Sequence, residues 1–317
     1  MPIILIVAVL LTGGVTVAAE NSVPGNLLYP VKIEVNESVR GALTLTAQGK
    51  AQWEADQAIR RLEEAAELSA EQKLDAQAKV DLENAFVVHE KAAEDRIVAL
   101  SEDGDNEAAA EVSADFEARL KANADILNRL AQKSQPDAAG NVILRVNAAI
   151  GALGQLRLAS EAAVGAQPDV DVAAQGAAKA ARNKLDEAKW FIDRRSAQVS
   201  AEVKTKAYAK LDAAEHAYVA AQAKFDAKAY ADAFIEFRSA SRLAQEAQEF
   251  ISGEQELEVK LDFDARSDFQ SDVQEDNAND DDRDDARVDL SAGADAKADD
   301  NALNGRADGQ MKIDLGY

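Results

Sequence analysis

Residues 203–225 read VKTKAYAKLDAAEHAYVAAQAKF, and this stretch decides the fold class. Its apolar side chains recur at intervals of three and four, which is the spacing of one face of an α-helix. Small alanines alternate with large residues along that face, which lets a second helix approach closely. The face consists of Val203, Ala207, Leu211, Ala214, Tyr218, Ala221 and Phe225. We predict a long helix here that packs against its neighbours through an Ala-rich seam.

The same periodicity recurs through most of the chain. We expect helices over Pro30–Thr46, Lys50–Leu68 and Lys73–Leu100, a fourth helix after the break at Glu102–Asp105, a fifth over Val142–Ala163, and three more before Ser252. The third helix has the apolar stripe Leu82, Phe86, His89, Ala93, Ile97 and Leu100, and the fourth has Val112, Phe116, Leu120, Leu127 and Leu130. The predicted fold is all-α, with two antiparallel bundle or hairpin modules, seams of the coiled-coil type and a disordered acidic tail.

Breaks in the pattern predict the domain organisation. Residues 1–19 form an N-terminal signal or anchor, 20–134 the first helical module, 135–253 the second, and 254–317 the tail. Gln135–Gly140 is expected to link the modules, and Gly253 to end the last helix. Lys224–Phe234 resembles the turn of a tetratricopeptide-type hairpin, in which an aromatic residue of the second helix packs back on the first. Because only one such copy is found, a hairpin within a bundle is favoured over a solenoid.

Charge and composition exclude several classes of function. The 317 residues carry 35 Lys and Arg against 58 Asp and Glu, a formal net charge of -23. A nucleic-acid binder needs a basic face to replace the counterions of phosphate, so nucleic acid is not expected as a partner. Cysteine is absent, which removes disulfides, thiol catalysis and Cys-ligated metals. Residues 135–253 have 15 basic and 15 acidic side chains, and this neutral module is the better candidate for a partner face, through Trp190, Phe191, Tyr218 and Phe234.

The N-terminus has the features of an export signal. Ile3–Leu11 is apolar throughout, and Val17-Ala18-Ala19 places small residues where a signal peptidase requires them. No Lys or Arg precedes the apolar run. An uncleaved anchor is the alternative, since Pro2–Ala19 approaches the lower limit of roughly 17 residues for a membrane-spanning helix. We therefore expect export to the envelope or the outside, with contact to a membrane only if this segment is retained.

The C-terminal segment combines low hydrophobicity with a net charge of -13 over residues 254–317. Such a composition buries too little apolar surface to offset the entropy of ordering, so residues 264–317 are expected to be disordered. Three short motifs share the order base, aliphatic, Asp, large apolar: Lys260–Phe263, Arg287–Leu290 and Lys312–Leu315. They are either a chance product of an Asp-rich tail or short strands that dock on a sheet edge.

The sequence offers no convincing set of catalytic or metal-binding residues. His89 lies on an apolar stripe and is expected to be buried and hydrogen-bonded, whereas His216 is expected to form a solvated pair with Asp212. The carboxylate pairs Glu63/Glu64 and Asp186/Glu187 are expected on solvated salt-bridge faces. Asp280, Asp282 and Asp284 alternate as in a calcium loop, but Asp285 replaces its Gly and Ser291 its late Glu. We therefore predict no catalytic, cofactor or metal site, and no enzyme.

One stretch carries a family resemblance. Pro24-Gly25-Asn26-Leu27-Leu28-Tyr29-Pro30-Val31-Lys32, followed by Glu37, resembles the opening of DUF5667, an uncharacterised bacterial domain family whose members typically begin P-G-x-x-L-Y-P-V-K. The helix with Arg60-Arg61-Leu62-Glu63-Glu64-Ala65 is similar to the family's next element. The resemblance covers roughly Pro24–Leu130. It implies an exported or membrane-tethered helical domain, with some relatives in envelope signalling, including anti-sigma-type proteins, and it supplies no catalytic residues.

These observations favour a non-catalytic, exported or envelope-associated helical interaction protein with an unidentified protein or envelope partner. The alternative is the regulatory ectodomain of an envelope-stress system of the anti-sigma type. An unrecognised hydrolase is a third hypothesis.

Overall fold

The computed structural model describes residues 19, 22–37, 41, 43–133 and 136–278. The chain divides into two compact units, Met1–Asp268 and Phe269–Tyr317. The described part contains helices and no strand, which confirms the predicted all-α fold. Residues 279–317, with the motifs at 287 and 312 and the calcium-like Asp280–Ser291, lie outside the described residues, as do residues 1–18.

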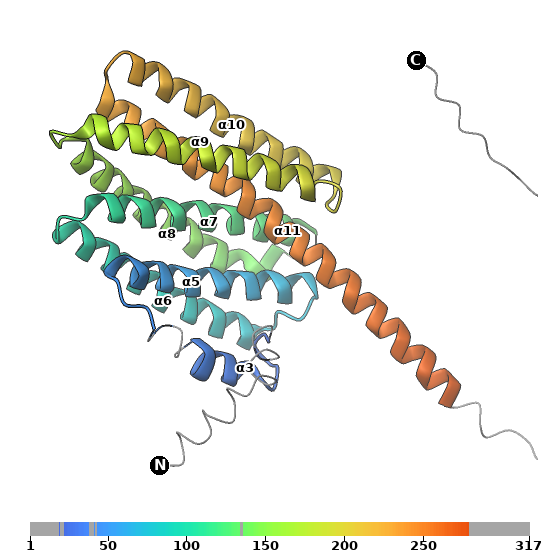
Figure 1. Cartoon of the computed structure of the whole chain (residues 1–317). Coiled ribbons are helices and arrows are strands. Elements are labelled where there is room, and N and C mark those ends of the chain that lie inside the picture. The colour runs from blue at the N-terminus through green and yellow to red at the C-terminus, as the bar shows by residue number, and fades with distance from the viewer. Residues whose placement is uncertain (1–18, 20–21, 38–40, 42, 134–135, 279–317) are drawn as a thin grey trace, which may run out of the picture. The chain divides into compact units, whose positions relative to one another are not determined.

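Among the described residues of the first unit, two short elements precede four long helices. α3 (Tyr29–Val31) and the π-helical η1 (Lys32–Glu37) precede α5 (Ala47–Ala70), α6 (Ala76–Glu102), α7 (Asn106–Lys133) and α8 (Pro136–Gly165). α5 pairs with α6 and α7 with α8, and α5 also packs on α7 (Figure 1). Thr46 and Asp75 cap α5 and α6 by accepting hydrogen bonds from the backbone amides of Gly49 and Ala78.

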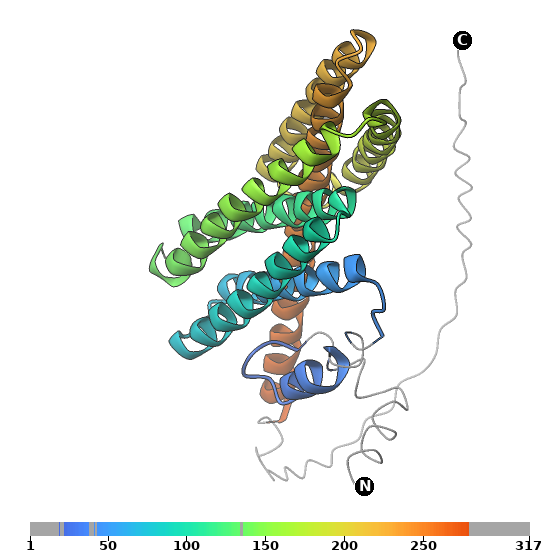
Figure 2. The same cartoon turned by 90° about the vertical axis from the view of Figure 1, so that its left-hand side faces the viewer.

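Three further helices follow: α9 (Val170–Arg195), α10 (Ala201–Asp226) and α11 (Tyr230–Ala278), and the part of α11 after Asp268 belongs to the second unit. α9 and α10 pack against each other, and α11 runs beside both (Figure 2). Polar contacts hold α11 in place, because Lys210 of α10 pairs with Glu246, and Arg129 of α7 pairs with Glu254. Buried side chains of both predicted modules, such as Phe116 and Leu211, belong to one hydrophobic core.

The predicted apolar faces are confirmed. Every residue of the stripes on α6 and α7 is buried except His89, which is partly exposed. In the stretch 203–225, Val203, Ala207, Leu211, Ala214 and Ala221 are buried, while Tyr218 and Phe225 pack on the core from its edge. The expected hairpin aromatics also meet, with the rings of Phe225 and Tyr230 centred 5.2 Å apart in an edge-on arrangement.

Three element predictions are wrong. The helix expected over Pro30–Thr46 is interrupted, and Thr46 instead caps α5. The linker Gln135–Gly140 is largely the first turn of α8, because Pro136 suits the first position of a helix. Gly253 does not end the last helix, since α11 continues to Ala278 and makes residues 264–278 helical. Of the two readings of the motif Lys260–Phe263, the strand is excluded, because these residues lie within α11.

Candidate functional site

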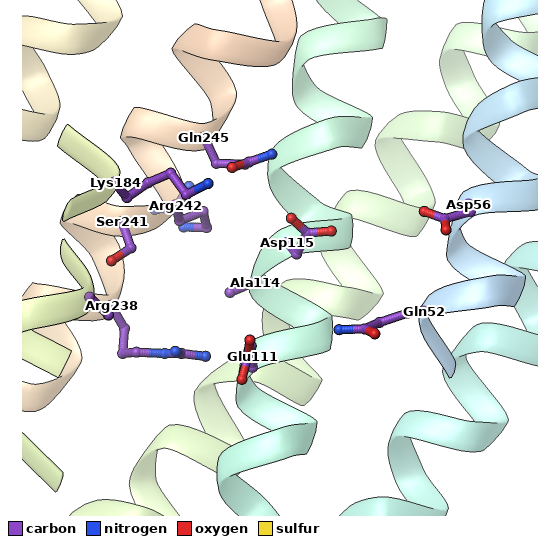
Figure 3. Close-up of a pocket in the computed structure, with 11 residues that line it drawn as sticks. Gln52, Asp56, Glu111, Ala114, Asp115, Lys184, Arg238, Ser241, Arg242 and Gln245 are labelled. Atoms are coloured by element: carbon purple, nitrogen blue, oxygen red, sulfur yellow. The ribbon is translucent and has the colours of Figure 1, made fainter. Parts of the chain in front are cut away.

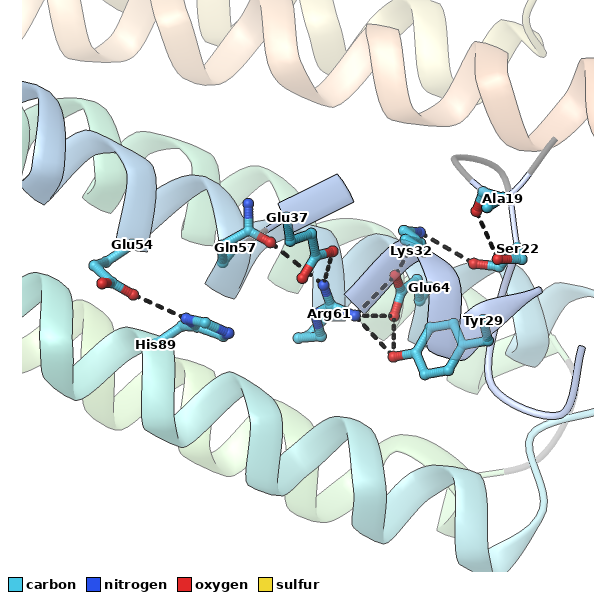
Figure 4. Close-up of polar contacts among 10 residues, drawn as sticks. All are labelled: Ala19, Ser22, Tyr29, Lys32, Glu37, Glu54, Gln57, Arg61, Glu64 and His89. Atoms are coloured by element: carbon cyan, nitrogen blue, oxygen red, sulfur yellow. Dashed lines mark hydrogen bonds and ion pairs between the residues drawn. The ribbon is translucent and has the colours of Figure 1, made fainter. Parts of the chain in front are cut away.

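A buried polar network joins the N-terminal motif to α5. Glu64 lies at its centre and accepts hydrogen bonds from Lys32 Nζ at 2.7 Å, from the Tyr29 hydroxyl at 3.0 Å and from Arg61 Nη1 at 3.0 Å (Figure 4). Arg61 also donates to the Tyr29 hydroxyl at 2.7 Å and pairs with Glu37. The family motif thus supplies Tyr29, Lys32 and Glu37, and α5 supplies Arg61 and Glu64.

The local backbone explains how the motif delivers both charges. Lys32 and Glu37 are five positions apart, which puts them on different faces of an α-helix. Lys32 is the first residue of η1 and Glu37 is the last. The i→i+5 hydrogen bonding of this π-helix brings residues five positions apart towards one face. Lys32 also donates to the Ser22 carbonyl at 3.0 Å and so ties down the preceding segment. Both charges must reach α5 from one face, and a π-helical turn allows this where an α-helix does not. This gives a physical reason why the α-helix expected over Pro30–Thr46 does not form.

Burial shapes the electrostatics of the network. Arg61 is 1 % exposed and Glu64 is 4 % exposed. Burial, with the Glu64 carboxylate close by, raises the pKa of the Tyr29 hydroxyl. Burial also raises the pKa of Glu37, against the opposing effect of Arg61. Two cations, Lys32 and Arg61, pair with two carboxylates, Glu37 and Glu64, so the charges balance within the network. We call this network the clamp, because it fixes the motif on α5.

The two carboxylate pairs noted in the sequence, Glu63/Glu64 and Asp186/Glu187, differ in burial. Glu64 is buried, so its predicted place on a solvated face is wrong, whereas Glu63 is exposed. On α9, Asp186 pairs with Arg182 at 3.3 Å and Glu187 pairs with Lys184 at 3.0 Å. Asp186 and Arg182 are each 61 % exposed, as expected for a solvated face.

The two histidines have ordinary structural partners. His89 Nδ1 lies 2.9 Å from Glu54 Oε2, and the His89 side chain is 28 % exposed, so it is hydrogen-bonded but less buried than predicted (Figure 4). His216 Nε2 lies 3.6 Å from Asp212 Oδ2, and both side chains are well exposed, which confirms the solvated pair. No group of three or more potential metal ligands occurs among the described residues.

A second buried polar cluster, which the sequence did not reveal, joins α7 and α8 to α11, where Arg242 lies 3.7 Å from Glu117. Glu117 of α7 pairs with Lys121 at 2.6 Å and with Arg157 of α8 at 2.7 Å. Arg157 also pairs with Glu161, which is fully buried, at 2.7 Å. Hydrogen bonds from Lys121 and Arg157 lower the pKa of Glu117, although burial opposes them. The available signal was an i,i+4 ion pair in a helix that otherwise has almost no charge.

A cleft of about 350 Å³ lies among α5, α7, α9 and α11 (Figure 3). Basic side chains come from α9 and α11, and carboxylates from α5 and α7, so the two sides have opposite charge. The lining includes Gln52, Asp56, Glu111, Asp115, Lys184, Arg238, Ser241, Arg242 and Gln245. Charged and amide groups converge here from distant parts of the sequence, and no sequence pattern indicated the cleft.

The predicted partner face on the second module is only partly exposed. Phe234 is buried, and Phe191 and Tyr218 are partly buried against the core, so their interpretation as a contact surface is weakened. Trp190 is 58 % exposed, and the Arg194 guanidinium lies 4.7 Å from its ring centre.

Comparison with known proteins identifies one domain. Residues 21–94 match the family model described as "Domain of unknown function (DUF5667)", which confirms the predicted resemblance over that range. The match includes the motif, all the residues of the buried clamp, and α6 as far as Glu94. Neither the curated proteins nor the solved structures give a match to the chain. The clamp between the motif and α5 thus lies wholly within the DUF5667 domain.

Proposed function

We propose that the protein is a non-catalytic, exported or envelope-associated helical interaction protein, and that it binds its partner through the outer face of α8. The observation that carries this proposal is the exposure of an apolar helix. The segment Asn141–Gly165 has a mean hydropathy of 1.3 over its most apolar window, yet only 28 % of that window is buried. An apolar surface left open in this way is typical of an interaction site.

The outer face of α8 is defined by its exposed residues. Leu144 is 69 % exposed and Leu158 is 53 % exposed. Between and beyond them lie small or uncharged exposed side chains, which complete the face: Ala148, Gly151, Ala152, Gln155, Ala159 and Ala162. Small residues at this spacing allow the backbone of a second helix to approach closely, and the two leucines provide apolar contact. The face therefore suits the apolar side of a partner helix.

The opposite face of α8 is already occupied. Val142, Val146 and Leu153 are buried in the core, and Arg157 pairs with Glu117 of α7. By length and composition this helix could also cross a membrane. The ion pairs of Arg157 and Glu161 would be costly in hydrocarbon, so packing in the bundle favours a protein helix over lipid as the occupant.

Charge also favours this face as the point of contact. The chain has a formal net charge of -23, so its surface repels other acidic surfaces. The outer face of α8 has no charged residue among its eight members, and a partner can approach there with little repulsion. Trp190 is a further exposed apolar side chain, on α9.

Export is the second part of the proposal. It rests on the apolar run Ile3–Leu11 and the small residues Val17-Ala18-Ala19, and the DUF5667 match begins at residue 21, just after them. Cell fractionation and determination of the N-terminus test it. We expect a new N-terminus at Glu20, or a membrane-tethered chain with residues 20–317 outside the cytoplasm. Full-length protein recovered free in the cytosol would contradict both forms. The alternative, a regulatory ectodomain, requires the tethered form and a cytoplasmic partner segment.

Crosslinking tests the contact surface. Because the chain has no cysteine, Ala152→Cys and Val219→Cys each introduce a single thiol. Ala152 lies in the middle of the proposed face, whereas Val219 is an exposed apolar residue of α10, 67 % exposed. With a short thiol-reactive crosslinker in producing cells, we expect one discrete adduct from Ala152→Cys only. Adducts from both positions, or from neither, would contradict the proposed face.

A further inference from the structure

The cleft among α5, α7, α9 and α11 has one wall of hydrogen-bond donors. Arg238, Ser241, Arg242 and Gln245 follow each other at i, i+3, i+4 and i+7 on α11, so they share one face of that helix. Lys184 of α9 adds a further cation beside them (Figure 3). Lys184 already pairs with Glu187 at 3.0 Å, and Arg242 lies 3.7 Å from Glu117, so Arg238 is the cation of this wall with no ion pair among the described residues.

Several of these donors have nothing to bind. Among the described residues, Nε and Nη2 of Arg238, Oγ of Ser241 and Nε of Arg242 are shielded from water and make no hydrogen bond. Buried donors are paired in most native structures, and each unpaired one carries a desolvation cost. Four such atoms on a single wall of one cleft are the largest concentration of unpaired donors in the described part of the chain.

The acidic wall does not neutralise these donors. Asp56 pairs with Arg119, and Asp115 lies 3.8 Å from the same guanidinium. Lys184 pairs at 3.0 Å with Glu187, which is not among the residues that line the cleft. Within the part of the chain that the structure describes, Arg238 has no carboxylate at ion-pairing distance. The cleft carboxylates therefore leave the Arg238 guanidinium without an ion-pair partner.

We propose that this cleft binds a small molecule through an anionic group, a carboxylate or a phosphate, that accepts hydrogen bonds from Arg238 and Ser241. Both groups accept several hydrogen bonds and match a planar guanidinium. Glu111 and Gln52 lie on the other wall, so the rest of the ligand carries a hydroxyl or an amine on that side. The facing carboxylates repel a polyanion, and the volume of about 350 Å³ limits the ligand to a small molecule.

The competing explanation is structural. Glu161 is fully buried with Oε1 unpaired, and Arg238 is close enough to oppose the rise that burial causes in the pKa of Glu161. If Arg238 only balances Glu161, the cleft binds no anion. The experiment must therefore separate ligand binding from stability.

The test uses the full chain and two simple probes, inorganic phosphate and acetate, titrated at constant ionic strength. Binding is followed for every variant by the rise in melting temperature, and in the parent, Ser241→Ala and the control also by the nitrogen-15 resonance of the Arg238 Nε–H group. A saturable shift with phosphate alone assigns the phosphate class, and one with acetate assigns the carboxylate class. We expect Arg238→Gln to weaken binding at least about tenfold and Ser241→Ala about fivefold.

Ser241→Ala keeps the test independent of folding, because it removes an unpaired buried hydroxyl and should leave the melting temperature without ligand equal or higher. Arg182→Gln, which loses the same charge at an exposed position of α9, is the matched control and should bind as the parent does. The proposal is overturned if neither probe gives a saturable shift, or if Arg238→Gln and Ser241→Ala bind as tightly as the control.

Discussion

Lys32 and Glu64 form an ion pair of 2.7 Å, although they are 32 positions apart and each is no more than 7 % exposed at its side chain. This contact closes the clamp that fixes the N-terminal motif on α5. Breaking a buried pair by removing one partner leaves an uncompensated charge, which costs far more than the pair itself contributes. The clamp is therefore expected to decide whether the DUF5667 domain folds.

Loss of Glu64 should be severe. Glu64→Ala leaves Lys32 and Arg61 buried without their shared carboxylate, and we expect the free energy of unfolding to fall by about 3–5 kcal/mol. Denaturant titration followed by circular dichroism measures this change. Asp186→Ala removes one member of an exposed ion pair and should change the free energy by less than about 0.5 kcal/mol. Equal effects of the two substitutions would contradict the clamp.

Glu90 of α6 should make stability depend on pH near neutrality. Burial, reinforced by the neighbouring Glu94 carboxylate, raises the pKa of Glu90 from 4.5 to about 7. The folded state therefore holds this proton more tightly than the unfolded state does. The stabilisation is complete below about 4.5 and is lost as the pH rises through about 7.

Glu90→Gln keeps the side chain neutral at every pH. We expect this variant to be more stable than the parent at pH 8, by on the order of 1 kcal/mol after allowance for partial exposure, and to match it at pH 4. Melting curves at a series of pH values measure the difference. A constant difference between the two proteins from pH 4 to pH 8 would show that Glu90 does not titrate as described.

Leu211 tests the seam of α10. It is 3 % exposed and lies between the buried Ala207 and Ala214. Leu211→Ala should lower the free energy of unfolding by about 2–5 kcal/mol through lost burial and a residual cavity. Val219→Ala, on the exposed side of the same helix, should change it by less than about 0.5 kcal/mol. Similar denaturation midpoints for both variants would mean that the register of α10 is wrong.

Two helix-interior glycines should respond in opposite directions. A Cβ at Gly151 of α8 meets nothing within 4 Å, so Gly151→Ala should stabilise the isolated chain by up to about 1 kcal/mol through helix propensity. A Cβ at Gly253 of α11 would lie 2.6 Å from Cδ1 of Ile126, a buried residue of α7. Gly253→Ala should therefore lower the melting temperature. If it raises the temperature as much as Gly151→Ala does, α11 does not pack against α7 here.

Local pattern and packing determine what the sequence could predict. The stripe on α10 from Val203 to Phe225 was predictable because it depends on residues three and four apart. The clamp was only half visible, since the motif and the helix with Arg61 and Glu64 were recognised separately. Their contact depends on the π-helical turn at Lys32–Glu37, which no local pattern revealed.

Two features required the three-dimensional structure. The cleft brings Asp56, Glu111, Lys184 and Arg238 together from four helices, and each residue alone resembles an ordinary surface charge. The exposure of α8 was also hidden, because an apolar helix is normally buried and its sequence gives no reason to expect otherwise. Gly253 was misread for a similar reason: its place within α11, beside Ile126 of α7, depends on packing between distant segments.

The most direct measurement of the central claim is the size of the complex that contains the protein when it is extracted from its own cells. The parent and Val219→Glu should migrate in a complex clearly larger than the 33.9 kDa chain. Ala152→Glu places a charge in the middle of the α8 face and should migrate as the lone chain while keeping the helical circular dichroism of the parent. A parent that already migrates as the lone chain, or an Ala152→Glu variant that keeps the large complex, would contradict the proposal that α8 is the partner-binding face.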